Sequence, residues 1–138
     1  MIHEKRIEIR WRDVDAFGHV SNAVYATYLE ECRDEWALRA LGHIGDIWDY
    51  VLARVAIDFR NELVQDDDAV LVRCRLVRVG TSSLGLREEI VKLDGTLAAE
   101  AEAVLVARER TQGGRSRPLT DAERAAFEAV LTDEQRRS

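Results

Sequence analysis

The sequence has few cysteines, and their positions exclude two kinds of protein. Its 138 residues include only Cys32 and Cys74, which lie inside apolar patterns without metal-ligand spacing. A disulfide framework or a zinc motif needs several cysteines at short, regular spacings. We therefore expect two buried free thiols that carry out no redox chemistry.

Long apolar runs are also missing. The first residues, MIHEKRIEIRW, carry charges at short intervals, where a signal peptide needs an unbroken apolar stretch. No window approaches the apolar length of a membrane span. With 46% apolar and 33% charged residues, the composition predicts one globular domain over residues 1–138, cytoplasmic and without a membrane partner.

Positive charge is in deficit, and histidine is scarce. The formal net charge is −6, which argues against nucleic-acid binding because phosphate neutralisation needs a basic surface. An anionic small ligand would need a local basic patch. His3, His19 and His43 have no ligand spacing, so we expect no metal and no other cofactor.

The apolar periodicity predicts a strand followed by a long helix. Ile7, Ile9 and Trp11 alternate with charged residues, which indicates a strand that ends near Trp11. From Asn22 to Leu41 the apolar spacing changes to three and four residues, which predicts a helix of about five turns. Ser21 or Asn22 can cap its start, and Gly42 can end it.

Strand character dominates from Val51 to about residue 108. Two strands follow from clear alternation, and two more flank Asp94-Gly95, a dipeptide typical of tight hairpin turns. The last of them, LAAEAEAVLVAR, is alanine-rich, but its apolar residues recur at every second position, so we predict a strand. After Pro118, Thr120 and Glu123 have capping-box spacing and begin a short helix.

This order of elements favours an α+β fold, with one antiparallel five-stranded sheet curled around the long helix. Such a sheet leaves its edges and its outer face uncovered. Pairing of two copies would cover them.

The stretch WRDVDAFGHVSNAVY gathers polar groups just before the long helix. Asp13, Asp15, His19 and Asn22 could each simply shape a turn or cap the helix. Together with Gly18, which permits a sharp bend, they lie beside the unpaired N–H groups and positive dipole of a helix start. A carboxylate next to such an oxyanion site can attack a polarised acyl carbonyl or activate water toward it. The stretch therefore points to acyl transfer to water.

The segment DVDAFGHVSNAVYATYLEECRDEW resembles the 4-hydroxybenzoyl-CoA thioesterase-like family of hotdog-fold acyl-CoA thioesterases. The positions that carry the resemblance are Asp15, Gly18, Val20, Tyr25, and Glu30 with Arg33. It continues through AIDFRNEL, VRVGTSSLGLREEI and LAAEAEAVLVAR, which covers nearly the whole chain. The resemblance implies the hotdog fold, hydrolysis of an acyl-CoA, and a homodimer or homotetramer with active sites between subunits.

The resemblance also implies roles for single residues. Asp15 would be the catalytic base or nucleophile, and the backbone N–H of Asn22 would polarise the thioester carbonyl, with Gly18 and Tyr25 in the substrate-binding motif. Asp13 would be a turn residue. His19 would either orient the site or pack against it, since GHVSN looks like the HVNN segment of acyl-ACP thioesterases.

A second group of residues is expected to hold the CoA. The family places a Gly/Ser/Thr-rich turn near the pantetheine and phosphates, and here that turn contains Thr81, Ser82 and Ser83. Arg115 and Arg117 resemble basic residues that contact the nucleotide phosphates in some members. A plain hairpin loop and a solvated tail are the competing interpretations.

Other functions remain open on the sequence alone. Hydratases of this fold pair a carboxylate with a histidine on the central helix, and this helix has none. An acyl-ACP thioesterase and a non-catalytic acyl- or CoA-binding module are the alternatives to an acyl-CoA thioesterase. The acyl group is undefined, because Tyr28, Trp36, Trp48 and Phe59 could each line its pocket.

Overall fold

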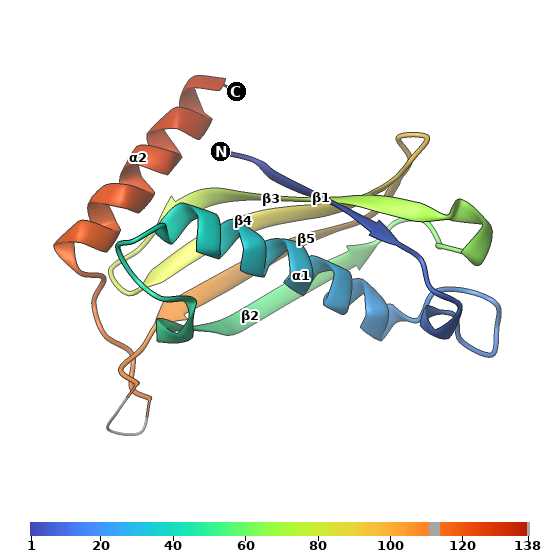
Figure 1. Ribbon diagram of the computed structural model, residues 1–138, viewed down its shortest axis with the longest axis horizontal. Helices are drawn as coiled ribbons and strands as arrows, with labels where there is room; N and C mark the ends of the chain where they lie inside the picture. The colour runs from blue at the N-terminus through green and yellow to red at the C-terminus, as the bar shows by residue number, and fades with distance from the viewer. Residues whose placement is uncertain (111–113, 138) are drawn as a thin grey trace.

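Five antiparallel strands form one sheet that curves around the long helix α1 (Asn22–Leu41) (Figure 1). The computed structural model describes residues 1–110 and 114–137. The strand order is β1-β3-β4-β5-β2. The bounds are β1 His3–Glu8, β2 Tyr50–Phe59, β3 Ala69–Val79, β4 Ser83–Lys92 and β5 Leu97–Ala107, and a second helix, α2, spans Asp121–Arg137. The predicted α+β arrangement of a sheet wrapped around one long helix is confirmed.

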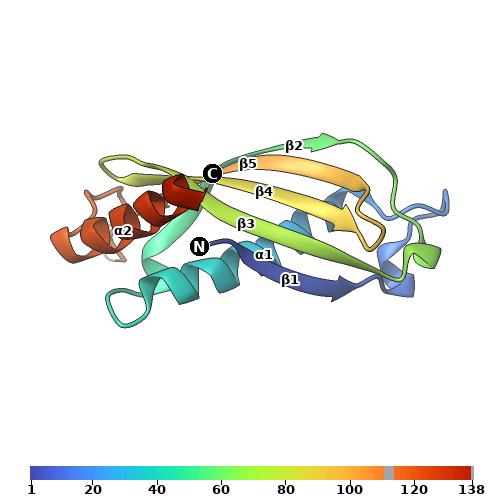
Figure 2. The same cartoon turned by 90° about the horizontal axis from the view of Figure 1, so that it is seen from above.

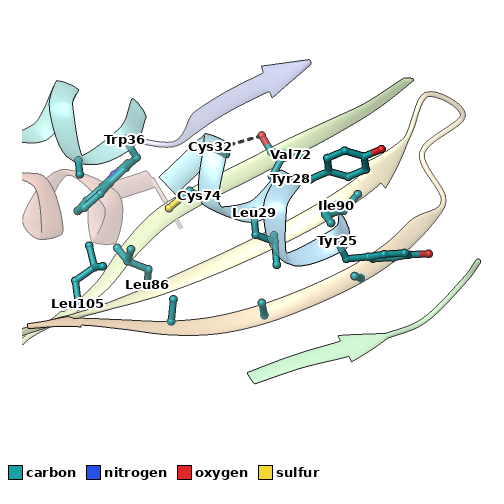
Figure 3. Packing of buried hydrophobic residues seen from close by; sticks show 14 of the residues in the cluster. Tyr25, Tyr28, Leu29, Cys32, Trp36, Val72, Cys74, Leu86, Ile90 and Leu105 are labelled. Carbon is teal, nitrogen blue, oxygen red and sulfur yellow. Dashed lines mark hydrogen bonds between the residues drawn. The ribbon is translucent and has the colours of Figure 1, made fainter. Parts of the chain in front are cut away.

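The core lies between α1 and the concave face of the sheet (Figure 3). Leu29, Cys32 and Trp36 of α1 are fully buried against inward residues of β3, β4 and β5. Both cysteines are buried and free, as predicted. Cys32 donates its thiol hydrogen to the Val72 carbonyl at 3.3 Å, and burial raises the pKa of this thiol to about 12. Neither thiol is therefore placed for thiolate chemistry at neutral pH.

The alanine-rich segment is a strand, as its two-residue period predicted. β5 pairs with β4 on one side and with β2 on the other, so the backbone of β5 forms sheet hydrogen bonds along both sides of the strand. Its inward residues Ala99, Ala101 and Ala103 are buried under the helix. Small side chains at these positions fill the concave side of the curved sheet. Tertiary pairing thus overrides the helical propensity of alanine.

Two elements differ from the sequence-based expectation. β1 ends at Glu8, and Trp11 begins a 3₁₀ turn in which its ring is 85% exposed. The strand cannot continue because the buried Asp13 carboxylate accepts the Arg10 backbone N–H at 2.9 Å and turns the chain. α2 is longer than the short helix expected, since it reaches Arg137. The ambiguous segment before β2 contains a 3₁₀ turn at Ile47–Asp49.

A buried ion pair fixes α1 to the sheet. Arg33 donates from Nε and Nη2 to the two carboxylate oxygens of Glu88 on β4, both at 2.7 Å. Both side chains are almost completely buried. Because removing either partner would leave an uncompensated charge in the core, the pair constrains where α1 can lie on the sheet.

The second helix is attached through a buried glutamate. α2 lies beside β3, and Phe127 stacks on Trp36 with ring centroids 6.1 Å apart (Figure 2). Glu123 accepts from both terminal nitrogens of Arg117, at 2.8 and 3.1 Å, and from the hydroxyl of Tyr50. Its carboxylate also accepts the Thr120 N–H, while Thr120 Oγ1 accepts the Glu123 N–H. The predicted capping box is confirmed.

This cluster should make the stability of the protein sensitive to acid. Burial alone would raise the pKa of Glu123, but hydrogen bonds from Arg117 and Tyr50 outweigh it and lower the pKa from 4.5 to about 2. A depressed carboxyl pKa stabilises the fold above the unfolded-state pKa and loses that contribution as pH falls toward the folded-state pKa. The contribution, roughly 3 kcal/mol by linkage, should therefore be present at pH 7 and disappear between about pH 4.5 and 2.

Urea unfolding of Glu123→Gln at pH 7, 4 and 3 checks this expectation. The free energy of unfolding should be well below that of the wild type at pH 7, and the gap should narrow as the pH falls. Glu128→Gln, on the exposed side of the same helix, is the control and should show a small, nearly constant difference. A gap for Glu123→Gln that does not change with pH would contradict the assignment.

Candidate functional site

The turn before α1 is a tight hairpin held by its own backbone. Val14 and Val20 form an isolated antiparallel bridge, and the Asp15 N–H donates to the His19 carbonyl at 2.8 Å. Gly18 has a φ of +84°, a conformation that side chains other than glycine rarely adopt. The tip of the turn, residues 15–19, is exposed. Local chain geometry therefore presents the Asp15 carboxylate to solvent.

Asp15 has one occupied and one open carboxylate oxygen. Oδ1 accepts the backbone N–H groups of Phe17 and His19, at 2.9 and 3.4 Å. Oδ2 has no hydrogen-bond partner within the part of the chain that the structure describes. The two backbone bonds orient the carboxylate while leaving an oxygen free for a reactant.

Asp13 has a different environment and a structural role. It is 2% exposed and accepts the Tyr28 hydroxyl at 2.7 Å as well as the Arg10 guanidinium at 3.1 Å. Burial would raise the pKa of this carboxyl, but these hydrogen bonds lower it overall. Asp13 therefore stabilises the turn through its contacts with Tyr28 and Arg10, as expected of a turn residue.

The start of α1 offers unpaired donors. Ser21 is the N-cap residue, but its side chain makes no capping hydrogen bond. Its carbonyl accepts the N–H groups of Val24 and Tyr25. The N–H groups of Asn22 and Ala23 have no acceptor among the described residues, and the first turn carries no acidic side chain to offset the helix dipole. The helix start can therefore bind a developing negative charge.

His19 and Tyr25 lie in this region but are engaged with other residues. His19 Nε2 is 3.0 Å from Glu62 Oε2, and both side chains are largely exposed. Tyr25 is buried, donates its hydroxyl to the Asn61 carbonyl at 3.2 Å, and contacts Phe59 edge to face. Each residue thus ties the turn and helix start to the segment after β2.

The residues expected to hold CoA lie at the other end of the molecule. The β3–β4 turn, with Thr81 and Ser82, and the segment that carries Arg115 and Arg117 are adjacent, because backbone bonds join Leu119 to Thr81 and Ala107 to Ser82. Figure 1 places this end at the C-terminal end of α1 and the Asp15 turn at its N-terminal end. A helix of 20 residues is about 30 Å long. A single chain therefore does not bring the two predicted groups together.

Within this second group the two arginines differ. The Arg117 guanidinium is bound to Glu123 through two hydrogen bonds, whereas the exposed Arg115 side chain has no partner among the described residues. Ser83 Oγ accepts from Arg78 at 3.2 Å, and the Thr81 carbonyl accepts from Arg124. Arg115 is thus the freer of the two for an anionic ligand.

A small cavity lies between α1 and the start of β2. It has a volume of about 110 Å³ and is lined by Glu30, Asp34, Ala37, Ile47, Leu52 and Leu105, among others. Burial and the nearby Glu30 carboxylate raise the pKa of Asp34. Of the aromatic residues considered for an acyl pocket, Tyr28 and Trp36 are buried in the core, and Phe59 and Trp48 are exposed.

β2 forms an open edge of the sheet. Among the described residues its only strand partner is β5, and eight of its ten residues are exposed, including Val55 at 37% and Phe59 at 46%. An unpaired edge with exposed apolar side chains is a template for pairing with another strand.

Two further features concern metals and membranes. No cluster of three or more histidine, cysteine or acidic side chains suited to a metal occurs in residues 1–110 and 114–137. No helix in these residues is long and apolar enough to cross a membrane.

The arginines on the outer face of the sheet carry no role predicted from the sequence. Arg73 and Arg75 alternate with the buried residues of β3, which does place them outside. Arg78 and Arg54 follow irregularities in β3 and β2, so simple alternation does not predict their orientation.

Comparison with known proteins identifies relatives over nearly the whole chain. A family model described as the thioesterase-like superfamily matches residues 9–133. A thioesterase from Thermus thermophilus, solved with coenzyme A and Zn, is 32% identical with a TM-score of 0.81, and the match covers 94% of each chain. The PA2801 protein from Pseudomonas aeruginosa is also 32% identical, with a TM-score of 0.74 over 91% of this chain and 97% of that chain.

More distant matches share the fold. A DHNA-CoA thioesterase from Staphylococcus aureus has a TM-score of 0.85 at 16% identity, over 99% of this chain and 95% of that chain. No curated protein matches the sequence.

Proposed function

The chain belongs to the thioesterase-like superfamily and is a thioester hydrolase with the hotdog fold, and from this membership we propose that it hydrolyses an acyl-CoA with Asp15 as its catalytic carboxylate. The observation that carries the proposal is that Asp15, with its open Oδ2, lies on the tight turn that leads directly into the α1 start, where the N–H groups of Asn22 and Ala23 have no acceptor among the described residues. The relative from Thermus thermophilus, which was solved with coenzyme A, supports CoA as the carrier.

In this proposal the start of α1 and Asp15 have different chemical roles. The thioester carbonyl oxygen accepts the Asn22 N–H, and the positive end of the α1 dipole stabilises the oxyanion that forms there. Asp15 either takes a proton from water as the water oxygen adds to the carbonyl carbon, or adds itself to form an anhydride that water then cleaves. In both routes the carbon–sulfur bond breaks and CoA leaves as the thiol.

The proposed site is completed by a second copy of the chain. Antiparallel pairing of β2 with β2 of another copy would place the Tyr50 end of one strand beside the Phe59 end of the other. The Phe59 end adjoins the Asp15 turn, since Val20 donates its N–H to the Leu63 carbonyl. The Tyr50 end adjoins the small cavity and lies at the same end of the sheet as the β3–β4 turn. Each Asp15 would then face the CoA-binding end of the partner, which accounts for their separation within one chain.

At that end we propose that Thr81, Ser82 and Ser83 contact the pantetheine and that Arg115 contributes to phosphate binding. The same role for Arg117 would require it to bind phosphate while it neutralises Glu123. Gly18 supports the bend of the turn, and Tyr25 and His19 hold its position.

Hydrolysis assays test the proposal and its alternatives. The wild type should release CoA from at least one member of a panel of short, long and aromatic acyl-CoAs, and this activity should require Asp15. An acylated carrier protein in the same panel tests the alternative carrier. Tight binding of acyl-CoA without turnover of any member would contradict the proposal and favour a binding module.

A further inference from the structure

Tyr28 contacts the segment before the Asp15 turn from inside the core. The residue lies about two turns from the start of α1 and is 1% exposed. Helical side chains lean toward the N-terminus of their helix, and Figure 3 shows the Tyr28 ring directed to the same end as that of Tyr25. The Tyr28 hydroxyl donates to Asp13 Oδ2 at 2.7 Å. A buried group of the helix thus binds a carboxylate two residues before Asp15.

Asp13 joins three parts of the chain at one point. Its Oδ2 also accepts the backbone N–H of Arg10, at 2.9 Å, in the segment that follows β1. Its backbone carbonyl accepts the N–H of Ser21, the N-cap residue of α1, at 3.0 Å. With the bond from Tyr28, the segment after β1, the start of α1 and the interior of α1 all meet at Asp13.

The Asp15 turn lies between the two residues that these bonds hold together, Asp13 and Ser21. Only Val14 separates Asp13 from Asp15, and Ser21 directly precedes the unpaired N–H of Asn22. A shift of Asp13 relative to α1 therefore moves the Asp15 carboxylate relative to the helix start. Hydrolysis as proposed above needs both groups to reach the same thioester carbonyl.

The other hydrogen bonds around the turn do not fix it to α1. The Arg10 side chain binds the Asp13 carboxylate, but it belongs to the same incoming segment and moves with it. Val20 donates its N–H to the Leu63 carbonyl, which holds the turn to the segment after β2. Among the described residues, Asp13 is hydrogen-bonded to the helix interior through Tyr28.

Water cannot easily replace this bond. Asp13 is 2% exposed and Tyr28 is 1% exposed, so a broken bond would leave a buried hydroxyl and a buried carboxylate with one partner fewer. Burial, and next the bond to Asp13, raises the pKa of Tyr28, so its hydroxyl stays protonated at neutral pH. Tyr28 therefore remains a donor and Asp13 an acceptor under the conditions of catalysis.

We propose that Tyr28 is a positioning residue for thioester hydrolysis, which through Asp13 holds the Asp15 carboxylate in place relative to the N–H groups at the α1 start. The inference rests on the proposed function, in which Asp15 is the catalytic carboxylate. Rates depend steeply on such placement, since a shift of about 1 Å can cost about a hundredfold. Tyr28 itself contacts no reactant.

Kinetics of Tyr28→Phe on the best thioester substrate test the inference. The change removes the hydroxyl and keeps the ring in the core. We expect kcat to fall by about tenfold and KM to change by less than about twofold, because placement is lost and no substrate contact is. Phe127→Leu, which reduces packing on Trp36 at the other end of α1, is the control and should keep kcat within about twofold of the wild type.

A double-mutant cycle shows whether Tyr28 acts through Asp15. If its kinetic role is to position that carboxylate, Tyr28→Phe should lower the residual kcat of Asp15→Asn by less than about twofold. A general loss of packing, or a separate catalytic contribution, would multiply the two effects. Full multiplication would therefore overturn the inference.

Asp13→Asn tests the same bond from its other side. The change replaces a carboxylate with a weaker, uncharged acceptor. Adding Tyr28→Phe to this variant should lower kcat by less than about twofold further, because both changes act on one bond. Effects that multiply would show two unrelated contacts and would contradict the proposed connection from Tyr28 to the turn.

Hydrogen exchange measures the turn without any substrate. The amide hydrogens of Asp15 and Ser21 should exchange faster in Tyr28→Phe than in the wild type, because the turn opens more often. Phe127→Leu should leave both rates unchanged. Equal rates in Tyr28→Phe and the wild type would show that the hydroxyl does not hold the turn, and would overturn the inference.

The outcomes separate this inference from the proposed function. Normal kcat in Tyr28→Phe, with Asp15→Asn inactive, would overturn the positioning role and leave the proposed function standing. Hydrolysis of an acylated carrier protein but of no acyl-CoA, with the loss in Tyr28→Phe unchanged, would support the positioning role and overturn acyl-CoA as the substrate. Full activity of Asp15→Asn would overturn both.

Discussion

Replacing Asp15 with asparagine should lower kcat for the best acyl-CoA by at least about a hundredfold, the effect expected when an acid–base or nucleophilic group is removed. The variant should remain folded, because the Asp15 side chain accepts only two backbone N–H groups on an exposed turn and an amide oxygen can accept them too. Steady-state kinetics together with circular dichroism measure both expectations. Turnover close to that of the wild type would show that another group carries out the chemistry.

Asp13→Asn is the matched control for this variant. Asp13 is buried and accepts hydrogen bonds from Tyr28 and Arg10. Asp13→Asn should therefore lower the free energy of unfolding more than Asp15→Asn does. Its effect on kcat should be clearly smaller. An opposite ranking, with Asp13 controlling kcat and Asp15 controlling stability, would reverse the two assignments.

Replacing Val55 with lysine should separate the chain into monomers and remove nearly all activity. Val55 lies in the middle of the open edge strand β2, and a two-fold axis there would place two lysines close together across the interface. Because each proposed site needs both copies, activity should fall at least about a hundredfold together with dimerisation. Sedimentation and kinetics at micromolar concentration measure the two effects.

Val77→Lys is the matched control for the edge variant. Val77 has the same 37% exposure as Val55, but it lies on β3, which pairs with β4 and, over Ala69–Cys74, with β1, so it is away from the open edge of β2. This variant should keep the assembly and the activity of the wild type. A Val55→Lys protein that is monomeric and still fully active would contradict the shared site.

Much of the fold could be predicted because its signals are local. The change from two-residue to three-and-four-residue spacing at Asn22 marks the start of α1, and Gly42 lies at its end with a φ of +55°. The end of β1 could not be predicted in the same way. The alternation continues to Trp11, and only the burial of Asp13 by Tyr28, 15 residues later in the chain, explains why the strand stops earlier.

The candidate site was predicted in part for the same reason. Asp15, Gly18 and Asn22 form one short turn, so their proximity follows from the chain itself. The separation of Asp15 from the β3–β4 turn depends on the strand order, which the sequence does not display. Arg78 illustrates a further limit: by alternation with Arg73 and Arg75 it would point inward, and the irregularity between Leu76 and Arg78 turns it to the outer face.

Because both native thiols are buried, the protein is suited to site-directed labelling at an introduced cysteine. Cys32 and Cys74 are enclosed in the core, and burial raises the pKa of both, so a maleimide or methanethiosulfonate reagent should leave the folded wild type unmodified. A single exposed cysteine, introduced as Phe17→Cys where the native ring is 85% exposed, would then carry the only spin label in each chain. Pulsed electron paramagnetic resonance on such a sample tests the proposed pairing of two copies, because a dimer would give one distance between its two labels and a monomer would give none. The native cysteines need not be removed.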